Sequence, residues 1–490
     1  MISVNEGLRQ MSDGAPVIVW FRQDLRVADN PALHHAVETG RPVLPVYIHD
    51  DATPNVRALG AAQKWWLHHA LGALQSRLRE LGARLILREG AAGDVLNALV
   101  EESGAAAVHW NRRYDRQGRA IDAQIKTNLK ERSIEAVSFA GHLMHEPAKV
   151  ETKSGGFFKV YTPFWRAFRA GAPPRDPFPA PGEIRGAGGN LASADLTEWR
   201  LLPTKPDWST GFSEWTPGEA GARARLDTFA AEHLDGYVTG RDAPGRDVTS
   251  KLSPHLRFGD ISPYQVWAKI DEVGDEVPAK DEETFRKELV WREFNHHLLF
   301  HFGELERNNV AQKFDAFPWR YDEGELKAWQ QGRTGYPIVD AGMRQLWRTG
   351  WMHNRLRMIT GSFLVKHLLH DWREGERWFW DCLVDGDPAN NPGNWQWVAG
   401  TGADASPYFR IFNPLIQGPK FDPDGDYVRE WVPELADMPA EHVHAPWEAP
   451  DDVLENAGVT LGETYPWPIV DHKFARSRAL AALEEVKQAA

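Results

Sequence analysis

Five short apolar runs alternate with amphipathic stretches over the first 140 residues, and this alternation constrains the fold more than any other feature of the chain. Each run has the length of a strand and is too short for a buried helix. The runs span residues 17–21, 43–48, 84–89, 105–110 and 135–139. Apolar strands separated by helices predict a five-stranded parallel sheet covered on both faces, so we expect a Rossmann-like α/β domain over residues 16–142. No G-x-G-x-x-G follows the first run, so the usual dinucleotide cradle is not indicated.

The strand signals disappear after this domain. Residues 143–215 are rich in proline and glycine and predict an interdomain linker. Residues 216–490 contain long stretches of helical periodicity, such as ETFRKELVWREFNHHLLFHF, and predict an all-α domain. Residues 1–15 lack the apolar core of a signal peptide, so we expect them to form a mobile N-terminal extension.

Composition narrows the class of protein. Hydrophobic residues make up 42% and charged residues 26%, which is typical of a soluble globular protein, and no apolar run has the length of a membrane span. The single cysteine, Cys382, can form no internal disulfide, so we expect a core residue in a cytoplasmic protein. One thiol also cannot hold an iron–sulfur cluster, and we expect no metal site. The net charge of −13 leaves a nucleic-acid partner open, because DNA binding depends on a local basic patch.

Tryptophan is unusually frequent. The chain has 22, and 14 of them lie at or after Trp267. Indoles fill cores well, so packing explains many of them. Indole is also the most easily oxidised aromatic side chain, and a helical domain dense in tryptophan therefore suits electron transfer as well.

Several long motifs resemble the photolyase/cryptochrome family. The chain opens with VIVWFRQDLRVADNPAL and later contains TSKLSPHLRFGDISP, KELVWREF and the stretch over residues 334–414, from TGYPIVDAGMRQLW to SPYFRIFNP. The resemblance covers nearly the whole chain. It is strongest to bacterial photolyases of cyclobutane pyrimidine dimers, in the branch nearest plant cryptochromes (class III). It implies an α/β domain, a long connector and a helical domain that binds FAD and DNA.

The resemblance also implies a flavin site. The hydroxyls and backbone N–H groups of TSKLS, residues 249–253, suit a phosphate, although a simple helix cap would also explain them. In the DGD motif of residues 385–387, two acids flank a glycine. Two carboxylates are too few oxygen ligands for calcium. The residues implied to contact FAD are Tyr237, Thr249, Ser250, Lys251, Leu252, Ser253, Glu288, Arg292, Asn354, Arg357, Asp385, Gly386, Asp387 and Asn391.

Two of these positions carry chemistry. Arg357 is implied to pair with Asp385 near the flavin ring, because a buried carboxylate needs such a partner. Asn391 is implied to lie beside flavin N5. An amide cannot change its protonation state, so Asn391 fits the fully reduced FADH⁻ as the working form of the cofactor.

A pocket for the pyrimidine dimer is implied as well. Its residues would be Glu288, Trp291, Asn354, Arg355, Met358 and Trp397. Glu288 and Trp291 are three apart on one predicted helix and share a face. Two indoles suit the faces of a bent, apolar ring system, and a carboxyl and an amide suit its edges. The lesion must leave the base stack to reach the flavin, and Arg241, Arg355 and Arg410 would hold phosphates of the UV-damaged DNA around it.

The implied reaction is light-driven electron transfer. Excited FADH⁻ passes an electron to the dimer, the cyclobutane ring splits and the electron returns, so the enzyme would be a deoxyribodipyrimidine photo-lyase. Trp395, Trp372 and Trp319 match the family's chain of tryptophans from the surface to the flavin, and Trp378 and Trp380 leave a second branch open. We expect the protein to act as a monomer.

Two alternatives share the fold. A (6-4) photolyase has a pair of pocket histidines, whereas Asn354 and Met358 stand at those positions here and His353 is one place off. A cryptochrome photoreceptor would lack repair activity. Asn391 and Trp397 favour the photolyase, although KWWLHHAL and NRRYD resemble plant cryptochromes.

Family members carry a second, light-harvesting chromophore, either 5,10-methenyltetrahydrofolate or 8-hydroxy-5-deazaflavin. Gln117 and Gly118 stand where one bacterial folate site has an Asn–Glu pair. Trp65 and Trp66 instead suggest a folate placed against an aromatic wall on the second predicted helix, although packing at the domain boundary explains them equally well. The sequence therefore predicts a folate that binds at a place different from the site with the Asn–Glu pair.

Overall fold

The computed structural model describes residues 14–404 and 409–489 and contains one parallel five-stranded sheet. The strand order is β3–β2–β1–β4–β5, which confirms the predicted Rossmann-like arrangement. The strands are β1 (Val17–Phe21), β2 (Val43–His49), β3 (Ile86–Glu89), β4 (Ala107–Asn111) and β5 (Glu135–Phe139). The predicted N-terminal extension lies almost wholly outside the described residues.

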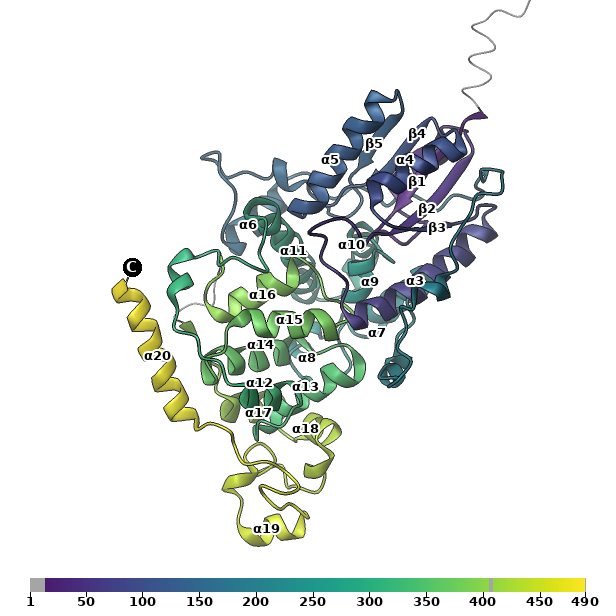
Figure 1. Ribbon diagram of the computed structural model, residues 1–490. Coiled ribbons are helices and arrows are strands. Elements are labelled where there is room, and N and C mark those ends of the chain that lie inside the picture. The colour runs from purple at the N-terminus through teal and green to yellow at the C-terminus, as the bar shows by residue number, and fades with distance from the viewer. Residues whose placement is uncertain (1–13, 405–408, 490) are drawn as a thin grey trace, which may run out of the picture.

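Helices cover both faces of this sheet (Figure 1). They are α2 (Pro31–Glu38), α3 (Ala61–Glu80), α4 (Ala92–Ser103) and α5 (Arg116–Glu131). Because strand side chains alternate, Val17 and Val19 of β1 pack with α2 and α3, whereas Ile18 and Trp20 pack with α4 and α5. The uninterrupted apolar run of β1 therefore serves two separate cores.

The predicted linker contains a helix that the sequence did not reveal, α6 (Tyr161–Ala170). Its buried face carries Phe164 and Phe168, and Phe164 packs against Phe294 at a ring-centroid distance of 5.3 Å. Phe294 belongs to α11 (Ala279–Phe302). The apolar spacing of α6 is helical, but only ten residues carry it, and proline and glycine follow directly.

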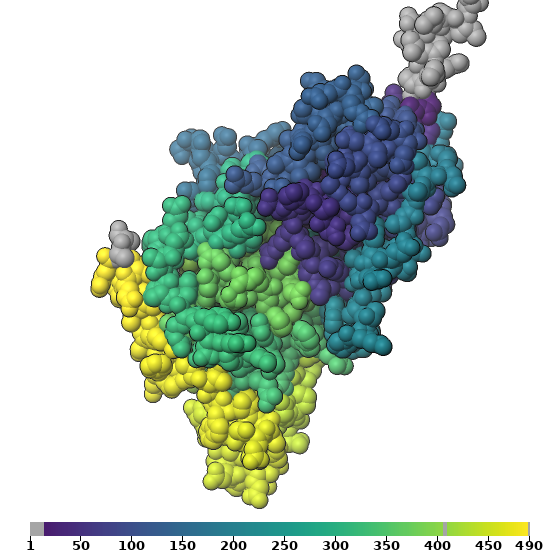
Figure 2. Space-filling model, viewed as in Figure 1, coloured from purple at the N-terminus to yellow at the C-terminus, as the bar shows by residue number. Residues whose placement is uncertain are grey.

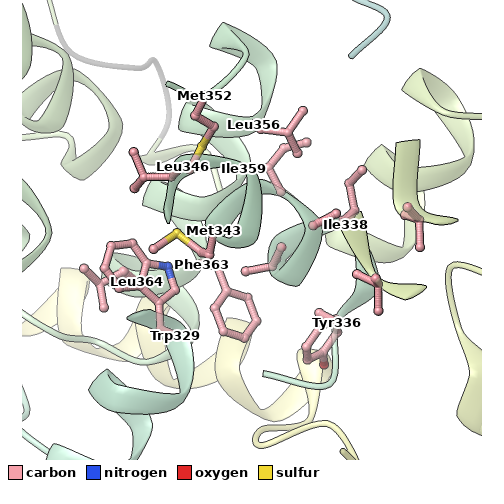
Figure 3. Packing of buried hydrophobic residues seen from close by; sticks show 14 of the residues in the cluster. Trp329, Tyr336, Ile338, Met343, Leu346, Met352, Leu356, Ile359, Phe363 and Leu364 are labelled. Carbon is pink, nitrogen blue, oxygen red and sulfur yellow. The ribbon is translucent and has the colours of Figure 1, made fainter. Parts of the chain in front are cut away.

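The remaining chain is helical, as predicted, and the part of it that the structure describes contributes no strand to the sheet. Its other helices are α7 (Glu219–Glu232), α8 (Tyr237–Gly240), α9 (Ser253–Phe258), α10 (Pro263–Val273), α12 (Glu323–Gln330), α13 (Pro337–Thr349), α14 (Asn354–Ser362), α15 (Trp372–Cys382), α16 (Asn390–Ala399), α17 (Pro414–Phe421), α18 (Asp426–Trp431), α19 (Asp451–Asn456) and α20 (His472–Ala489). A large apolar core unites the helices from α12 onward, and Figure 3 shows Trp329, Met343 and Phe363 within it. Helices α7, α8, α10 and α11 pack with α6 in a second core. Cys382 is buried, as expected.

The two parts meet along α3 and α15, and Figure 2 shows the purple and blue α/β part seated against the green helical part. Asp260 is fully buried at this junction. Its Oδ2 accepts hydrogen bonds from Trp66 Nε1 at 3.1 Å and from the backbone N–H of Gly218 at 2.9 Å, and it lies 2.9 Å from His255 Nδ1. One carboxylate therefore fastens α3 to the helical part.

This contact corrects one hypothesis. Trp65 is 8% exposed and Trp66 is fully buried, and Trp66 packs edge-on against Trp215 and His255. The two indoles form part of the core between the domains, so they present no open wall to a folate. Adjacent residues on a helix point in different directions, and here both directions lead into protein.

Within the described residues, none of the helices combines the length and the apolarity that crossing a membrane requires.

We predict that Asp260→Ala lowers the free energy of unfolding by about 3 kcal/mol, because it leaves the N–H groups of Trp66 and Gly218 buried without an acceptor. Chemical denaturation followed by circular dichroism measures the change. Asp437→Ala at an exposed position is the control and should change stability by less than about 0.5 kcal/mol. Equal stabilities of the two variants would contradict the role assigned to Asp260.

Candidate functional site

Three distant segments meet at the carboxylate of Asp385, in the loop before α16. Ser253 Oγ at the start of α9 donates to Oδ2 at 2.6 Å, and Arg357 of α14 donates to both oxygens at 3.1 and 2.8 Å. Asp385 is only 8% exposed. The ion pair expected between Arg357 and Asp385 is therefore formed, and the Ser253 hydroxyl joins it from a motif 132 positions earlier in the sequence.

Arg225 holds the loop of residues 249–252 through hydrogen bonds to its backbone carbonyl groups. Arg225 donates to the carbonyl oxygens of Ser250 at 3.1 Å and Thr249 at 3.3 Å. The Lys251 ammonium lies 3.2 Å from Glu214 and 3.3 Å from Asp247, and Leu252 is buried. Lys251 is thus already paired with carboxylates, and the hydroxyl groups of this loop remain the candidates for a phosphate.

Asp387 and Arg292 point into a buried cluster behind the loop. Asp387 Oδ1 accepts from the backbone N–H groups of Ala389 and Asn390 at 2.9 and 2.7 Å and so caps α16. Arg292 donates to the carbonyl oxygen of His142 at 3.0 Å. Burial by itself would raise the pKa of Asp387, but the neighbouring His296 and arginines hold this pKa well below its usual range. Direct contact of Asp387 and Arg292 with a cofactor stays a prediction.

Gly386 lies against the α/β part. A Cβ at this position would lie 2.6 Å from Gln63 Nε2 of α3, so a larger residue would have to displace that side chain. Arg257 donates to the Gly386 carbonyl oxygen at 2.5 Å. Contact of Gly386 with a cofactor stays a prediction.

Asn391 is buried at the start of α16, and its Nδ2 donates to Glu376 of α15. Glu376 in turn pairs with Arg57 of the α/β part. Sequence reasoning missed both Glu376 and Arg57. They are 319 positions apart and carry no shared motif, so no local signal could have found the pair.

The residues assigned to the substrate pocket come partly together. Arg241 donates to Glu288 of α11 at 2.6 Å, and its neighbour Asp242 pairs with Arg355 of α14 at 2.7 Å. Met358 Sδ lies 3.8 Å from Arg355 Nη1. Residues 241–242 therefore bridge α11 and α14. Asn354 is exposed at the start of α14, Trp397 is half-buried on α16, and their part in the pocket stays a prediction, as does that of Tyr237, which is buried beside Phe229 and Phe285.

Trp291 has one covered face. Tyr161 stacks on it at a ring-centroid distance of 3.7 Å and an interplanar angle of 7°. The Tyr161 hydroxyl donates to the carbonyl oxygen of Lys287 at 2.7 Å, which fixes the stack to α11. Trp291 is half-buried, and its contact with a ligand stays a prediction. Tyr161 lies in the predicted linker and was not identified from the sequence.

Both Arg241 and Arg355 are paired with carboxylates, so any phosphate would compete with Glu288 and Asp242 for them. Arg410 is exposed and lies over the ring of Phe412 at 4.9 Å. Its predicted contact with DNA is untested.

His353 has a structural role. Its Nδ1 accepts from the backbone N–H of Arg355 at 3.1 Å, so it caps α14. Burial lowers the pKa of His353 to about 4, which keeps the ring neutral and able to accept this bond.

The three tryptophans of the expected electron path belong to one core. Trp395 packs edge-on against Phe379 and Trp329, at centroid distances of 4.9 and 6.1 Å. Trp372 is fully buried, and its Nε1 donates to Asn309 Oδ1 at 2.9 Å. Trp319 is half-buried at the edge of the same core. The set thus contains two buried indoles and one half-buried indole, and an electron path through them stays a prediction.

A hollow of about 1080 Å³ opens on the surface of the helical part, beside this core. It lies between α12, α13, α15 and α18, and Tyr321, Trp347, Trp378 and Trp431 line it. The rings of Trp347 and Trp378 are parallel within 5° at a centroid distance of 5.8 Å, and Trp347 is 55% exposed. We name it the Trp347 groove. The sequence did not indicate it, because its walls come from four separate helices.

The donors around Asp385 fit a flavin. A carboxylate held by an arginine and an amide with a free oxygen suit the N–H groups on the edges of such a ring, and the hydroxyls of residues 249–253 suit its phosphates.

Comparison with known proteins agrees with this chemistry. Residues 285–485 match the FAD-binding domain of DNA photolyase, and residues 17–182 match the DNA photolyase domain. The chain is 56% identical to the deoxyribodipyrimidine photo-lyase of Agrobacterium fabrum over 97% of this chain and 98% of that protein. It is 37% identical to cryptochrome-1 of Arabidopsis thaliana over 97% of this chain and 71% of that protein.

A solved structure is also similar over nearly the full length. The crystal structure of a bacterial class III photolyase from Agrobacterium tumefaciens superposes with a TM-score of 0.94 at 56% identity, covering 97% of this chain and 98% of that one.

Glu293, next to Arg292 in the sequence, is a buried acid that makes the stability of the protein depend on pH. Glu293 is 2% exposed and accepts hydrogen bonds from the backbone N–H groups of Met144 and His145. Burial raises the pKa of Glu293 from 4.5 to about 7. Between these values the folded protein holds a proton that the unfolded chain has lost, so this contribution to stability is complete below pH 4.5 and disappears as the pH rises through 7.

We predict that the stability of the wild type relative to Glu293→Gln falls by about 3 kcal/mol between pH 4.5 and pH 8, since the variant cannot titrate. Urea denaturation at a series of pH values measures it. Glu272→Gln at an exposed position is the control and should show no such trend. A difference independent of pH would show that Glu293 is ionised throughout.

Proposed function

The chain belongs to the photolyase/cryptochrome family, and from this premise we propose that it is a deoxyribodipyrimidine photo-lyase, which splits cyclobutane pyrimidine dimers in UV-damaged DNA. One observation carries the proposal. The chain is 56% identical over nearly its whole length to a protein of that name, and the match includes both domains. Dimer repair in light, assayed with purified protein, tests it, and repair only in the dark or none at all would refute it.

Bound FAD in its reduced state supplies the light-excited electron that opens the cyclobutane ring and is recovered when the ring has split, so the reaction is a lyase reaction. The protein's own groups hold this cofactor. Asp385, fixed by Arg357 and Ser253, presents a carboxylate to N–H groups of the ring. Asn391 presents its amide oxygen, because the nitrogen is used by Glu376. The hydroxyls of Thr249 and Ser250 bind phosphate.

Glu288 and Trp291 form the wall that receives the flipped dimer. They lie three residues apart on α11 and therefore on one face. Tyr161 supports Trp291 from behind, so the free face of the indole packs on a pyrimidine ring. Arg241 orients the Glu288 carboxylate, which accepts hydrogen bonds from the dimer. Asn354, Met358 and Trp397 complete the pocket, and Arg355 and Arg410 bind phosphates beside it.

The pocket favours cyclobutane dimers over (6-4) products. A (6-4) photolyase needs histidines that move protons, and the nearest candidate, His353, is buried and occupied in capping α14. A photoreceptor role without repair is the other alternative in this family. The repair assay separates the two.

Trp395, Trp372 and Trp319 relay electrons from the surface to the flavin site. Trp319 at the edge of the core is the end that a reductant in solution can reach, and Trp395, on the same helix as Asn391, is the end at the flavin. Trp378 and Trp380 on α15 form a second branch beside it.

Glu288→Ala should lower the repair rate about tenfold, because the dimer loses a charged hydrogen-bond partner. Repair of a thymine-dimer oligonucleotide under limiting light is the measurement, with flavin absorbance as the check on FAD content. Glu283→Ala, five residues earlier on the same helix and 41% exposed, is the matched control and should repair normally. Loss of FAD in the Glu288 variant would mean that this residue supports the cofactor site instead.

The antenna chromophore is a folate bound in the Trp347 groove. The buried Trp65 and Trp66 offer no surface for it, whereas the groove is large enough for a flat conjugated ring and presents aromatic faces to it. Lys327, Arg344 and Arg348 at its walls suit the carboxylates of a folate.

Trp378→Leu should abolish a near-UV absorption band of the purified protein while the flavin band remains, because the folate loses its stacking partner. Mass spectrometry of the material released by gentle heating identifies the chromophore. Trp467→Leu, at an exposed indole outside the groove, is the control. Release of a deazaflavin would refute the folate, and an unchanged band in Trp378→Leu would refute the place.

A further inference from the structure

We propose that Arg57 of the α/β domain is a positioning residue for the flavin site, because it fixes the amide of Asn391 through Glu376. The α/β domain would then set the redox behaviour of the flavin directly, apart from any light harvesting. The inference rests on the proposed function in one respect, since it takes Asn391 to face flavin N5.

The first link is a two-pronged ion pair across the domain boundary. Arg57 Nη1 donates to Glu376 Oε1 and Nη2 to Oε2, both at 2.8 Å. The Glu376 side chain is 1% exposed and that of Arg57 is 30% exposed. A carboxylate buried to this degree needs a cation and hydrogen bonds to stay charged. Arg57 supplies both in a geometry that fixes the plane of the carboxylate.

The second link orients the amide. Asn391 Nδ2 donates to Glu376 Oε1 at 2.8 Å and to the Glu376 carbonyl oxygen at 3.0 Å. Both partners only accept, so a flipped amide would place Oδ1 against two acceptors and lose both hydrogen bonds. The ionised Glu376 therefore selects one of the two orientations of Asn391, with the amide oxygen left for the flavin.

The segment that carries Arg57 is itself anchored on α15. The Arg57 guanidinium lies 3.8 Å above the ring of Trp380, and Trp380 Nε1 donates to the carbonyl oxygen of Ala58 at 2.9 Å. Gln63 Nε2 donates to the Trp380 carbonyl oxygen at 2.7 Å. A Cβ at Gly60 would overlap that same carbonyl group, so the close approach requires a glycine. Arg57 is thus held in place by contacts that do not involve Glu376.

The consequence is a preference for the reduced flavin. N5 carries a hydrogen in the reduced cofactor and none in the oxidised one, so an amide oxygen that accepts from it stabilises the reduced form. Without Arg57 the buried carboxyl is neutralised by a proton, and a protonated carboxyl can donate to Oδ1. A flipped amide then faces one acceptor, the Glu376 carbonyl oxygen, and no longer two, so the selection is weaker.

The test is the midpoint potential of the purified, FAD-loaded protein, measured by spectroelectrochemistry. Arg57→Met should keep FAD and shift the potential of the two-electron couple down by about 30 mV, a tenfold change in the ratio of reduced to oxidised flavin. Reoxidation in air should become faster. Arg77→Met, at an exposed arginine of α3, is the control and should leave the potential unchanged.

Glu376→Gln provides the second arm, since it removes the same carboxylate and leaves in place the packing of Arg57 on Trp380. It should lower the potential to a similar extent, and the double variant should match the single ones, because both act on one linkage. An unchanged potential in FAD-loaded Arg57→Met, or in Glu376→Gln where Arg57→Met fails to fold, overturns the inference. Repair by the wild type is tested separately, so failure of the proposed function is recognised independently.

Discussion

This structure depends on a few buried carboxylates. Each of them needs hydrogen-bond or ion-pair partners from distant parts of the chain. Asp385, Glu376 and Asp260 are all at most 8% exposed, and each is satisfied by groups from other segments. An unpaired charge in such a place costs several kcal/mol, so each pairing fixes the position of the elements that supply it. The α/β part, the loop of residues 249–253 and helices α14 to α16 are registered against one another in this way.

The same pairings explain why the site sits at the junction of the domains. α15 presents Glu376 toward Arg57 and supports Asn391 through the same carboxylate. The loop before α16 receives Arg357 on one side and Gln63 of α3 on the other. The α/β part therefore helps to hold the proposed flavin site in shape. Its loop before α3 supplies Arg57, and α3 supplies Gln63.

Local patterns predicted the fold well, because strands and helices leave a periodic trace in the sequence. The run over residues 135–139 became β5 without a change of bounds, and the run over residues 84–89 lost its first two residues. α6 was missed because its pattern is short and is followed by proline and glycine. Trp65 and Trp66 suited a chromophore wall and packing at the domain boundary equally well, and their side chains face the domain junction. A helical pattern cannot tell a buried face from a binding face when the partner element is far away.

The sequence by itself determined the α/β and helical domains, and the residue types at the positions proposed for the flavin and the dimer, including the absence of histidine at two of them. These properties are local, or are carried by motifs whose residues lie close together in the chain. Only the tertiary structure decided which partner each charge takes. Arg57 meets Glu376 across 319 positions, Lys251 is drawn to Glu214 and Asp247, and Arg241 pairs with Glu288. Such pairs depend on how whole elements pack, since electrostatic and hydrogen-bond partners are chosen by distance in space, and that distance leaves no trace in the spacing of residues along the chain.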